Sequence, residues 1–158
     1  MTSSAESANN QREPLRPEQA HVIIVEDNAD NLLVVMKLLK MIGVERINWR
    51  TTGSQVVQFV QSLSQANTEG RPDLILLDIG LPGEDGYQVL AALRADPLLQ
   101  NTRVVAVTVR NAAIEMPRAR AAGFDGFIGK PIDPLRFPDQ IKRVLAGESI
   151  WESNSAIT

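Results

Sequence analysis

The chain has 158 residues, of which 44% are hydrophobic and 22% are charged, a composition typical of one globular domain with a substantial core. It has no cysteine and one histidine, His21, which excludes disulfide scaffolds, cysteine zinc sites, thiol nucleophiles and sites built from several imidazoles. The formal net charge of -3 is carried by the two ends of the chain, and residues 20–147 are neutral, so we expect no nucleic-acid partner.

The two ends of the chain, residues 1–19 and 148–158, are predicted to be flexible tails. Both stretches are rich in small and polar residues, and Trp151 is expected to pack on the body. Residues 1–19 have no apolar stretch like that of a secretory signal, and no apolar run elsewhere approaches the length of a membrane span. We therefore expect a cytoplasmic location and no membrane partner, with residues 20–147 forming one domain.

Five segments of this domain are predicted to be strands, and a helical pattern follows each of them. The strand segments are HVIIVED from residue 21, RINWRT from residue 46, DLILLD from residue 73, RVVAVT from residue 103 and GFIGKP from residue 126. The predicted helices are Asn31–Ile42, Ser54–Gln65 with Ser54 as its N-cap, Tyr87–Ala95, Met116–Ala122 with Pro117 in its first turn, and a last helix that ends at Ala146 and is bent or delayed by Pro138. His21 is predicted to be a surface residue and Trp49 a packing residue.

Strands that alternate with helices require crossover connections, which predict a parallel sheet with helices on both faces, a doubly wound α/β fold. In such sheets ligands bind at the carboxyl ends of the strands. The polar residues at these ends are Glu26, Asp27, Asp78, Thr108 and Lys130. The sequence therefore predicts a functional site that combines acids, a hydroxyl and an ammonium group.

Three carboxylates that converge at one edge repel each other unless a cation lies among them. Magnesium suits an open site of this kind, because it commonly takes one or two carboxylates, a phosphate and several waters. One carboxylate would then act as a nucleophile towards a phosphoryl donor. Lys130 and the Thr108 hydroxyl fit the task of binding phosphoryl oxygens.

Four motifs of the chain resemble those of the receiver domain of bacterial response regulators. They are VIIVEDN with its acidic pair, LILLDIGLPGEDG with Asp78, VVAVT with its terminal hydroxyl, and FIGKPI with its lysine and proline. The resemblance covers about residues 20–147. It implies a flavodoxin-like (βα)5 fold in which five parallel strands have the order 2-1-3-4-5.

The resemblance also implies a role for each site residue. Asp78 would be the phosphoacceptor, and Glu26, Asp27, Asp78 and the backbone carbonyl of Gly80 would bind Mg²⁺ or Mn²⁺. Thr108 and Lys130 would bind the phosphoryl group, Thr108 and Phe127 would form the conformational switch, and the Lys130–Pro131 peptide would be cis.

As a receiver, the chain would accept a phosphoryl group from a histidine kinase or a phosphotransfer domain and would not be a classical enzyme. The residues after Gly147 are too few for a DNA-binding or enzymatic output domain, so we expect a stand-alone protein that signals to a downstream protein target. The resemblance leaves open a homodimer through the face of the fourth predicted helix, the fifth strand and the fifth helix.

Two residues depart from the family pattern, and they leave a second function open. Val109 follows Thr108 where the family prefers alanine or glycine, and it is expected to narrow access to the phosphoryl group. A pseudo-receiver, which keeps the fold as a binding adaptor without the chemistry, is therefore the alternative. Glu26 stands where aspartate is more frequent, and its longer side chain favours contact with the metal through water. A hydrolase of similar fold is less favoured because its second catalytic carboxylate is replaced by Gly80, and neither GxxxxGK nor GxGxxG is present to indicate nucleotide binding.

Overall fold

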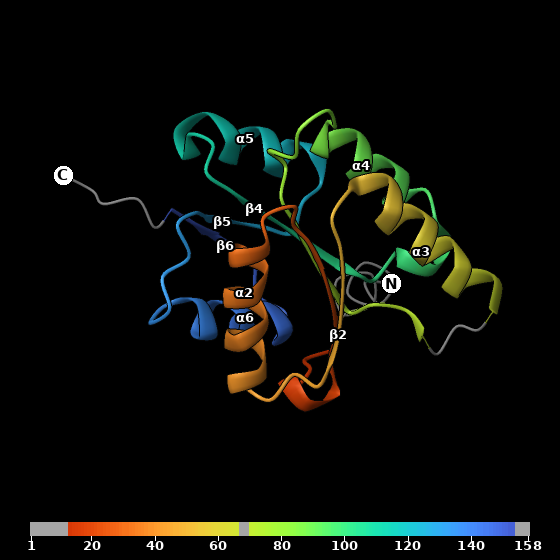
Figure 1. The fold of residues 1–158 in the computed structure, drawn as a ribbon, viewed down its shortest axis with the longest axis horizontal. Coiled ribbons are helices and arrows are strands. Elements are labelled where there is room, and N and C mark those ends of the chain that lie inside the picture. Colours follow the sequence, from red (N-terminus) through yellow and green to blue (C-terminus); the bar gives the residue numbers. More distant parts are fainter. Residues whose placement is uncertain (1–12, 67–69, 154–158) are drawn as a thin grey trace, which may run out of the picture.

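Six parallel strands form one sheet at the centre of the molecule (Figure 1). They are β1 (His21–Val25), β2 (Arg46–Arg50), β3 (Leu74–Leu77), β4 (Arg103–Thr108), β5 (Gly126–Gly129) and β6 (Ile150–Glu152), in the order β2-β1-β3-β4-β5-β6. The structure, a computed structural model, describes residues 13–66 and 70–153. The five predicted strands and the order 2-1-3-4-5 are confirmed, and a sixth strand extends the sheet beyond β5.

Helices cover both faces of the sheet, which is why β1, β3, β4 and β5 are buried on both sides (Figure 1). The helices α2 (Ala29–Met41) and α6 (Phe137–Leu145) lie on one face, and α3 (Gly53–Ala66), α4 (Gly86–Arg94) and α5 (Ala112–Ala122) lie on the other. Successive strand residues such as Ile23 and Ile24 therefore pack into two separate cores. Short 3-10 helices at Pro17–Gln19 and Pro97–Leu99 complete the described elements. No helix of the described residues is long and apolar enough to cross a bilayer.

The C-terminal strand β6 is formed by residues that the sequence assigned to a flexible tail. Gly126 allows the close approach of β6 to β5, since a Cβ at this position would lie 2.7 Å from the Ile150 carbonyl oxygen. Ile150 is buried, and Trp151 packs against the core as expected. The predicted C-terminal tail is therefore wrong for these residues, because an apolar side chain and backbone pairing together hold them on the sheet.

Part of the predicted N-terminal tail also contacts the body. The backbone N–H of Leu15 donates to the Leu145 carbonyl oxygen at 2.8 Å, and the Leu15 side chain packs against the core beneath α2 and α6. The rest of both predicted tails, residues 1–12 and 154–158, lies outside the described residues.

Helix α3 begins at Gly53, and its capping residue is Thr52 instead of the predicted Ser54. The hydroxyl oxygen of Thr52 accepts from the Gln55 N–H at 3.2 Å. Threonine and serine are both good N-caps, so the local sequence does not distinguish between the two positions.

Helix α5 begins at Ala112, earlier than predicted, because Asn111 caps it by accepting from the Ala113 N–H at 2.9 Å. Pro117 therefore lies inside the helix and not in its first turn. The carbonyl that loses its helical donor to this proline belongs to Ala113, an exposed residue within reach of water. The delayed start of the last helix, at Phe137, is confirmed.

Two further side chains lie differently from the prediction. His21 is 4% exposed and not on the surface, because its ring nitrogens lie 3.1 Å from the Gly70 carbonyl oxygen and 2.6 Å from Asn48 Oδ1. Trp49 is 45% exposed, because β2 is an edge strand and its pleat turns this residue outward.

Candidate functional site

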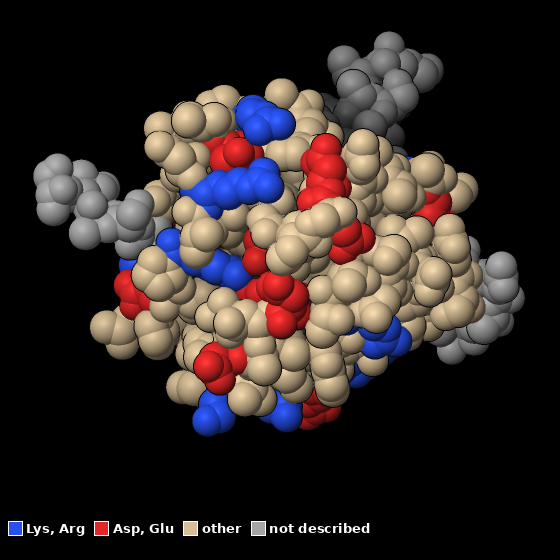
Figure 2. Space-filling view, turned by 45° about the horizontal axis from the view of Figure 1, so that its top comes forward, with Lys and Arg blue, Asp and Glu red and all other residues tan. Residues whose placement is uncertain are grey.

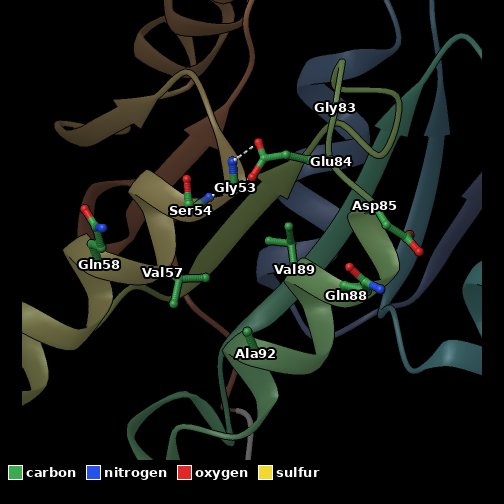
Figure 3. Close-up of a pocket in the computed structure, with 10 residues that line it drawn as sticks. All are labelled: Gly53, Ser54, Val57, Gln58, Gly83, Glu84, Asp85, Gln88, Val89 and Ala92. Atoms are coloured by element: carbon green, nitrogen blue, oxygen red, sulfur yellow. Dashed lines mark hydrogen bonds between the residues drawn. The ribbon is translucent and has the colours of Figure 1, made fainter.

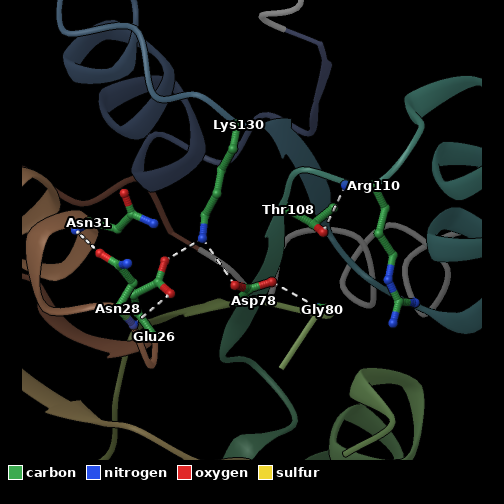
Figure 4. Close-up of polar contacts among 8 residues, drawn as sticks. All are labelled: Glu26, Asn28, Asn31, Asp78, Gly80, Thr108, Arg110 and Lys130. Atoms are coloured by element: carbon green, nitrogen blue, oxygen red, sulfur yellow. Dashed lines mark hydrogen bonds and ion pairs between the residues drawn. The ribbon is translucent and has the colours of Figure 1, made fainter. Parts of the chain in front are cut away.

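Polar residues predicted at the strand ends lie together at the carboxyl edge of the sheet, and Figure 4 shows four of them, Glu26, Asp78, Thr108 and Lys130. Strands β1 and β3 are paired as far as Val25 and Leu77, so the next residues, Glu26 and Asp78, leave the sheet side by side. Carboxylate oxygens of Glu26, Asp27 and Asp78 all lie within 4.8 Å of one another. In the space-filling view of this edge, several acidic side chains lie near the middle, with basic side chains beside them (Figure 2).

Lys130 extends from the end of β5 to two of these carboxylates. Its Nζ donates to Glu26 Oε1 and, at 3.0 Å, to Asp78 Oδ2. Burial by itself lowers the pKa of the Lys130 ammonium, but the two carboxylates outweigh burial and raise the pKa, so the group stays charged. The ammonium therefore neutralises part of the acidic cluster. The Lys130–Pro131 peptide is cis, as the resemblance implied.

Backbone amides orient the same carboxylates. Asp78 Oδ1 accepts from the Gly80 N–H at 2.7 Å, and Glu26 Oε2 accepts from the Asn28 N–H at 3.2 Å. Burial raises the pKa of Glu26 in spite of its contact with Lys130. The side chain of Asp78 is 12% exposed, so these bonds hold it in place while solvent still reaches it.

Thr108, the last residue of β4, is fully buried beside this cluster. Its hydroxyl oxygen accepts from the Arg110 N–H at 3.2 Å. A Cβ on Gly80 would lie 3.3 Å from Asp78 Oδ1 and 3.5 Å from Thr108 Oγ1. The absence of a side chain at Gly80 therefore leaves a small space between the carboxylate and the hydroxyl.

The donor set fits a magnesium ion. Mg²⁺ binds oxygens at about 2.1 Å, so two oxygens on one ion lie at most about 4.2 Å apart. The three carboxylates lie within 4.8 Å of one another, somewhat beyond this limit, so an ion bound to all three would need an intervening water or a small closing motion. Both oxygens of Glu26 are engaged, by Lys130 and Asn28, and so are both oxygens of Asp78, by Lys130 and Gly80, whereas Asp27 is exposed. The side chain of Glu26 is 5% exposed and that of Asp78 is 12% exposed, so an ion reaches Asp27 and Asp78 more readily than Glu26.

Glu84, which lies in the loop between Asp78 and α4, was not among the predicted site residues. Its carboxylate accepts from the Gly53 N–H at 2.6 Å and from the Ser54 N–H at 2.9 Å, at the start of α3 (Figure 3). Its partner Gly53 lies 31 positions away in the chain. No local pattern distinguishes this acid from a solvated turn residue.

The fold and the site together define a doubly wound α/β protein with an acidic, metal-competent site at the carboxyl edge of its sheet. Residues 22–142 match the response regulator receiver domain, and the chain belongs to this family. Receiver domains are signalling proteins of two-component systems and not classical enzymes, and they interact with histidine kinases or phosphotransfer proteins and with downstream targets.

Named relatives and solved structures agree with this assignment. The polar-differentiation response regulator DivK of Brucella anthropi is 37% identical over 124 residues, which are 78% of this chain and 94% of the relative. The receiver domain of the sensor histidine kinase PA1611 from Pseudomonas aeruginosa, with a magnesium ion coordinated in its active site cleft, is 26% identical and has a TM-score of 0.65, covering 82% of this chain and 98% of that chain. The chemotaxis response regulator CheY4 of Vibrio cholerae is 21% identical and has a TM-score of 0.67, covering 80% and 98% of the two chains.

Proposed function

We propose that Asp78 accepts a phosphoryl group from a phosphohistidine of a histidine kinase or a phosphotransfer domain. Membership of the receiver family supports this class of donor. The observation that carries the role of Asp78 is its position among the other carboxylates with Lys130 Nζ at 3.0 Å. An ammonium at this distance neutralises charge that would otherwise repel an incoming phosphoryl group.

In the transfer, a carboxylate oxygen of Asp78 attacks phosphorus. The P–O bond of an acyl phosphate forms, the P–N bond to the donor imidazole breaks, and the imidazole takes a proton from solvent. Because the nucleophile is already ionised, the step needs in-line positioning and charge neutralisation and no general base. Lys130 would pair with one phosphoryl oxygen, and the Thr108 hydroxyl would donate to another across the space beside Gly80.

We propose that Mg²⁺, or Mn²⁺ in its place, binds to Asp27, Asp78 and the backbone carbonyl of Gly80, with Glu26 contacting it through water. The proximity of the three carboxylates supports this site, as does the magnesium ion in the PA1611 receiver domain. When bound, the ion supplies positive charge to the phosphoryl oxygens.

Thr108 and Phe127 are proposed to carry the signal away from Asp78. Both are fully buried, and the strand register points them to the same face of the sheet, the one covered by α3, α4 and α5. A movement of Thr108 towards a phosphoryl group would change the packing around Phe127 and thereby the surface that a downstream protein meets.

The test is labelling of the full chain by acetyl phosphate with and without Mg²⁺, followed by intact mass spectrometry. We expect one phosphoryl group per chain, dependent on Mg²⁺ and absent from Asp78→Asn. Labelling that survives Asp78→Asn would contradict the role of Asp78. A wild-type chain that neither acetyl phosphate nor a phosphorylated histidine kinase labels would support the pseudo-receiver alternative. This alternative stays open because the exposed side chain of Val109 lines the same cavity as Lys130.

The homodimer and the cytoplasmic location expected from the sequence stay predictions. Sedimentation of the chain with and without acetyl phosphate tests the dimer, and imaging of a fluorescent fusion tests the location. A dimer that depends on the face of α5, β5 and α6 would be weakened by charged substitutions there and unaffected by substitutions on β2.

A further inference from the structure

The loop of residues 79–85, which follows Asp78, is held on helix α3 by the side chain of Glu84, although the two segments are far apart in the sequence (Figure 3). The two carboxylate oxygens accept separately from Gly53 and Ser54, the first two residues of α3, at 2.6 and 2.9 Å. With Thr52 accepting from Gln55, the first three N–H groups of α3 all have side-chain acceptors. These groups have no acceptor within the helix itself, and a negative charge is favoured beside them.

The close approach of α3 and α4 at this contact depends on Gly53. A Cβ at this position would lie 2.3 Å from Val89 Cγ2 and 3.0 Å from Glu84 Oε2. Any side chain at this position would push both α4 and the Glu84 carboxylate away from α3. The backbone of α3 is therefore placed close enough for Glu84 to reach two amides at once.

Between Glu84 and the phosphoacceptor site, two hydrogen bonds brace the loop. The Gly80 N–H donates to Asp78 Oδ1 at 2.7 Å, and the Glu84 N–H donates to the Leu81 carbonyl oxygen at 3.3 Å. Ile79 and Leu81 are buried beneath the loop. A displacement of Glu84 would therefore be passed along four residues to Gly80, whose carbonyl is a proposed metal ligand.

We propose that Glu84 is a positioning residue for the phosphoacceptor site: by holding the 79–85 loop on α3, it keeps the Gly80 carbonyl and Asp78 in the arrangement that binds the metal. This inference deepens the proposed function and rests on it. Glu84 touches neither the metal site nor the phosphoryl group, so it acts through the backbone of the loop.

The experiment compares Glu84→Ala and Glu84→Gln with Asp96→Ala in the full chain. Asp96 is a suitable control because its carboxylate also accepts from a backbone amide at a helix start, Leu98 N at 3.0 Å, but at the opposite end of α4. Two quantities are measured: the affinity for Mn²⁺ by electron paramagnetic resonance, and amide hydrogen exchange of residues 79–85. Neither depends on phosphorylation.

We expect Glu84→Ala to weaken Mn²⁺ binding about tenfold, as substitutions of residues that support metal ligands do, and to speed exchange in the loop. Glu84→Gln keeps one acceptor oxygen and should lie between wild type and alanine. Asp96→Ala should match the wild type in both measurements. Should Glu84→Ala fail to fold, Glu84→Gln alone still gives the comparison.

The inference would be overturned if both Glu84 variants had the same Mn²⁺ affinity and the same loop exchange rates as the wild type. It would also be overturned if Asp96→Ala lost as much Mn²⁺ affinity as Glu84→Ala. The failure of the proposed function gives a different result, namely no labelling of Asp78 in the wild-type chain. The Mn²⁺ comparison remains decisive for Glu84 in that case, because it uses the metal alone.

Discussion

Phe127 on β5 and Trp151 on β6 stand opposite each other in the parallel register of these strands. Partners in register point to the same face of a sheet, so Trp151 lies beside the side chain that we propose as part of the switch. Phe127 is fully buried, and Trp151 packs against the same core. Strand β6 lies beyond residues 22–142, which match the receiver family. The C-terminal strand is therefore an addition to the receiver domain that contacts its proposed switch directly.

Replacing Trp151 by alanine should destabilise the protein. The indole packs on the core and stacks beneath the Arg120 guanidinium, 4.5 Å from the ring centroid, and its partial burial predicts a loss of about 2 kcal/mol in the free energy of unfolding. Denaturant unfolding followed by circular dichroism measures the change. Trp49→Ala is the matched control, because this 45% exposed residue should cost less than about 1 kcal/mol. Equal losses in the two variants would show that Trp151 stabilises the fold no more than the exposed Trp49 does.

Acid should loosen β6 through Glu152. A hydrogen bond from Gln140 lowers the pKa of this carboxyl below its ordinary value of 4.5, and Arg143 and Arg136 lower it further against the opposing effect of burial. Because the folded pKa is the lower one, the carboxylate stabilises the fold above pH 4.5, and this contribution is lost as the pH falls through the folded pKa. Amide exchange of residues 150–152 should therefore rise relative to the core below pH 4.5. In Glu152→Gln this pH dependence should disappear, and its persistence would assign the effect to another group.

Replacing Lys130 by methionine should affect both stability and labelling. The ammonium contacts Glu26 and Asp78, and its side chain is 7% exposed, so its removal leaves two close carboxylates without their cation. We expect a loss of up to about 3 kcal/mol in the free energy of unfolding, together with loss of labelling by acetyl phosphate. Lys142→Met on the exposed side of α6 is the control and should change neither.

Added Mg²⁺ tests whether Lys130 and the metal ion neutralise the same carboxylates. The ion supplies the positive charge that the substitution removes, so it should raise the unfolding midpoint of the variant more than that of the wild type. An equal rise in both proteins would mean that Lys130 and the metal do not share these carboxylates.

Val109→Ala should speed labelling by small donors. Val109 is 75% exposed and lines a cavity of about 260 Å³ together with Lys130, so its side chain stands beside the path to the phosphoacceptor. Its exposure predicts a change of less than about 0.5 kcal/mol in stability. The initial rate of labelling with acetyl phosphate is the measurement, and equal rates in the two proteins would dispose of the idea that Val109 narrows access.

The sequence by itself determined the elements of the receiver domain and the edge at which its site forms. Apolar runs that end abruptly in acids, at Glu26 and at Asp78, set both the strands and their polar ends. Alternation with helices makes the strands parallel, and parallel strands bring their carboxyl ends to one edge. Caps such as Asn28 act within three residues of their partners, so they too can be predicted from the local sequence, although Ser54 shows that neighbouring candidates compete.

Only the tertiary structure decided which groups pair across the chain. The sequence predicted that Lys130 and Glu26, 104 positions apart, lie at one edge, but only the structure shows that they pair directly, and it alone pairs Glu84 with Gly53, 31 positions away. Contacts between residues far apart in the sequence also bury His21 and join β6 to the sheet. Hydrophobic periodicity and capping are written within a few residues, whereas such contacts depend on how closely whole elements dock. Gly53 and Gly126 show the physical reason, since a missing Cβ has meaning only once the neighbouring element is in place.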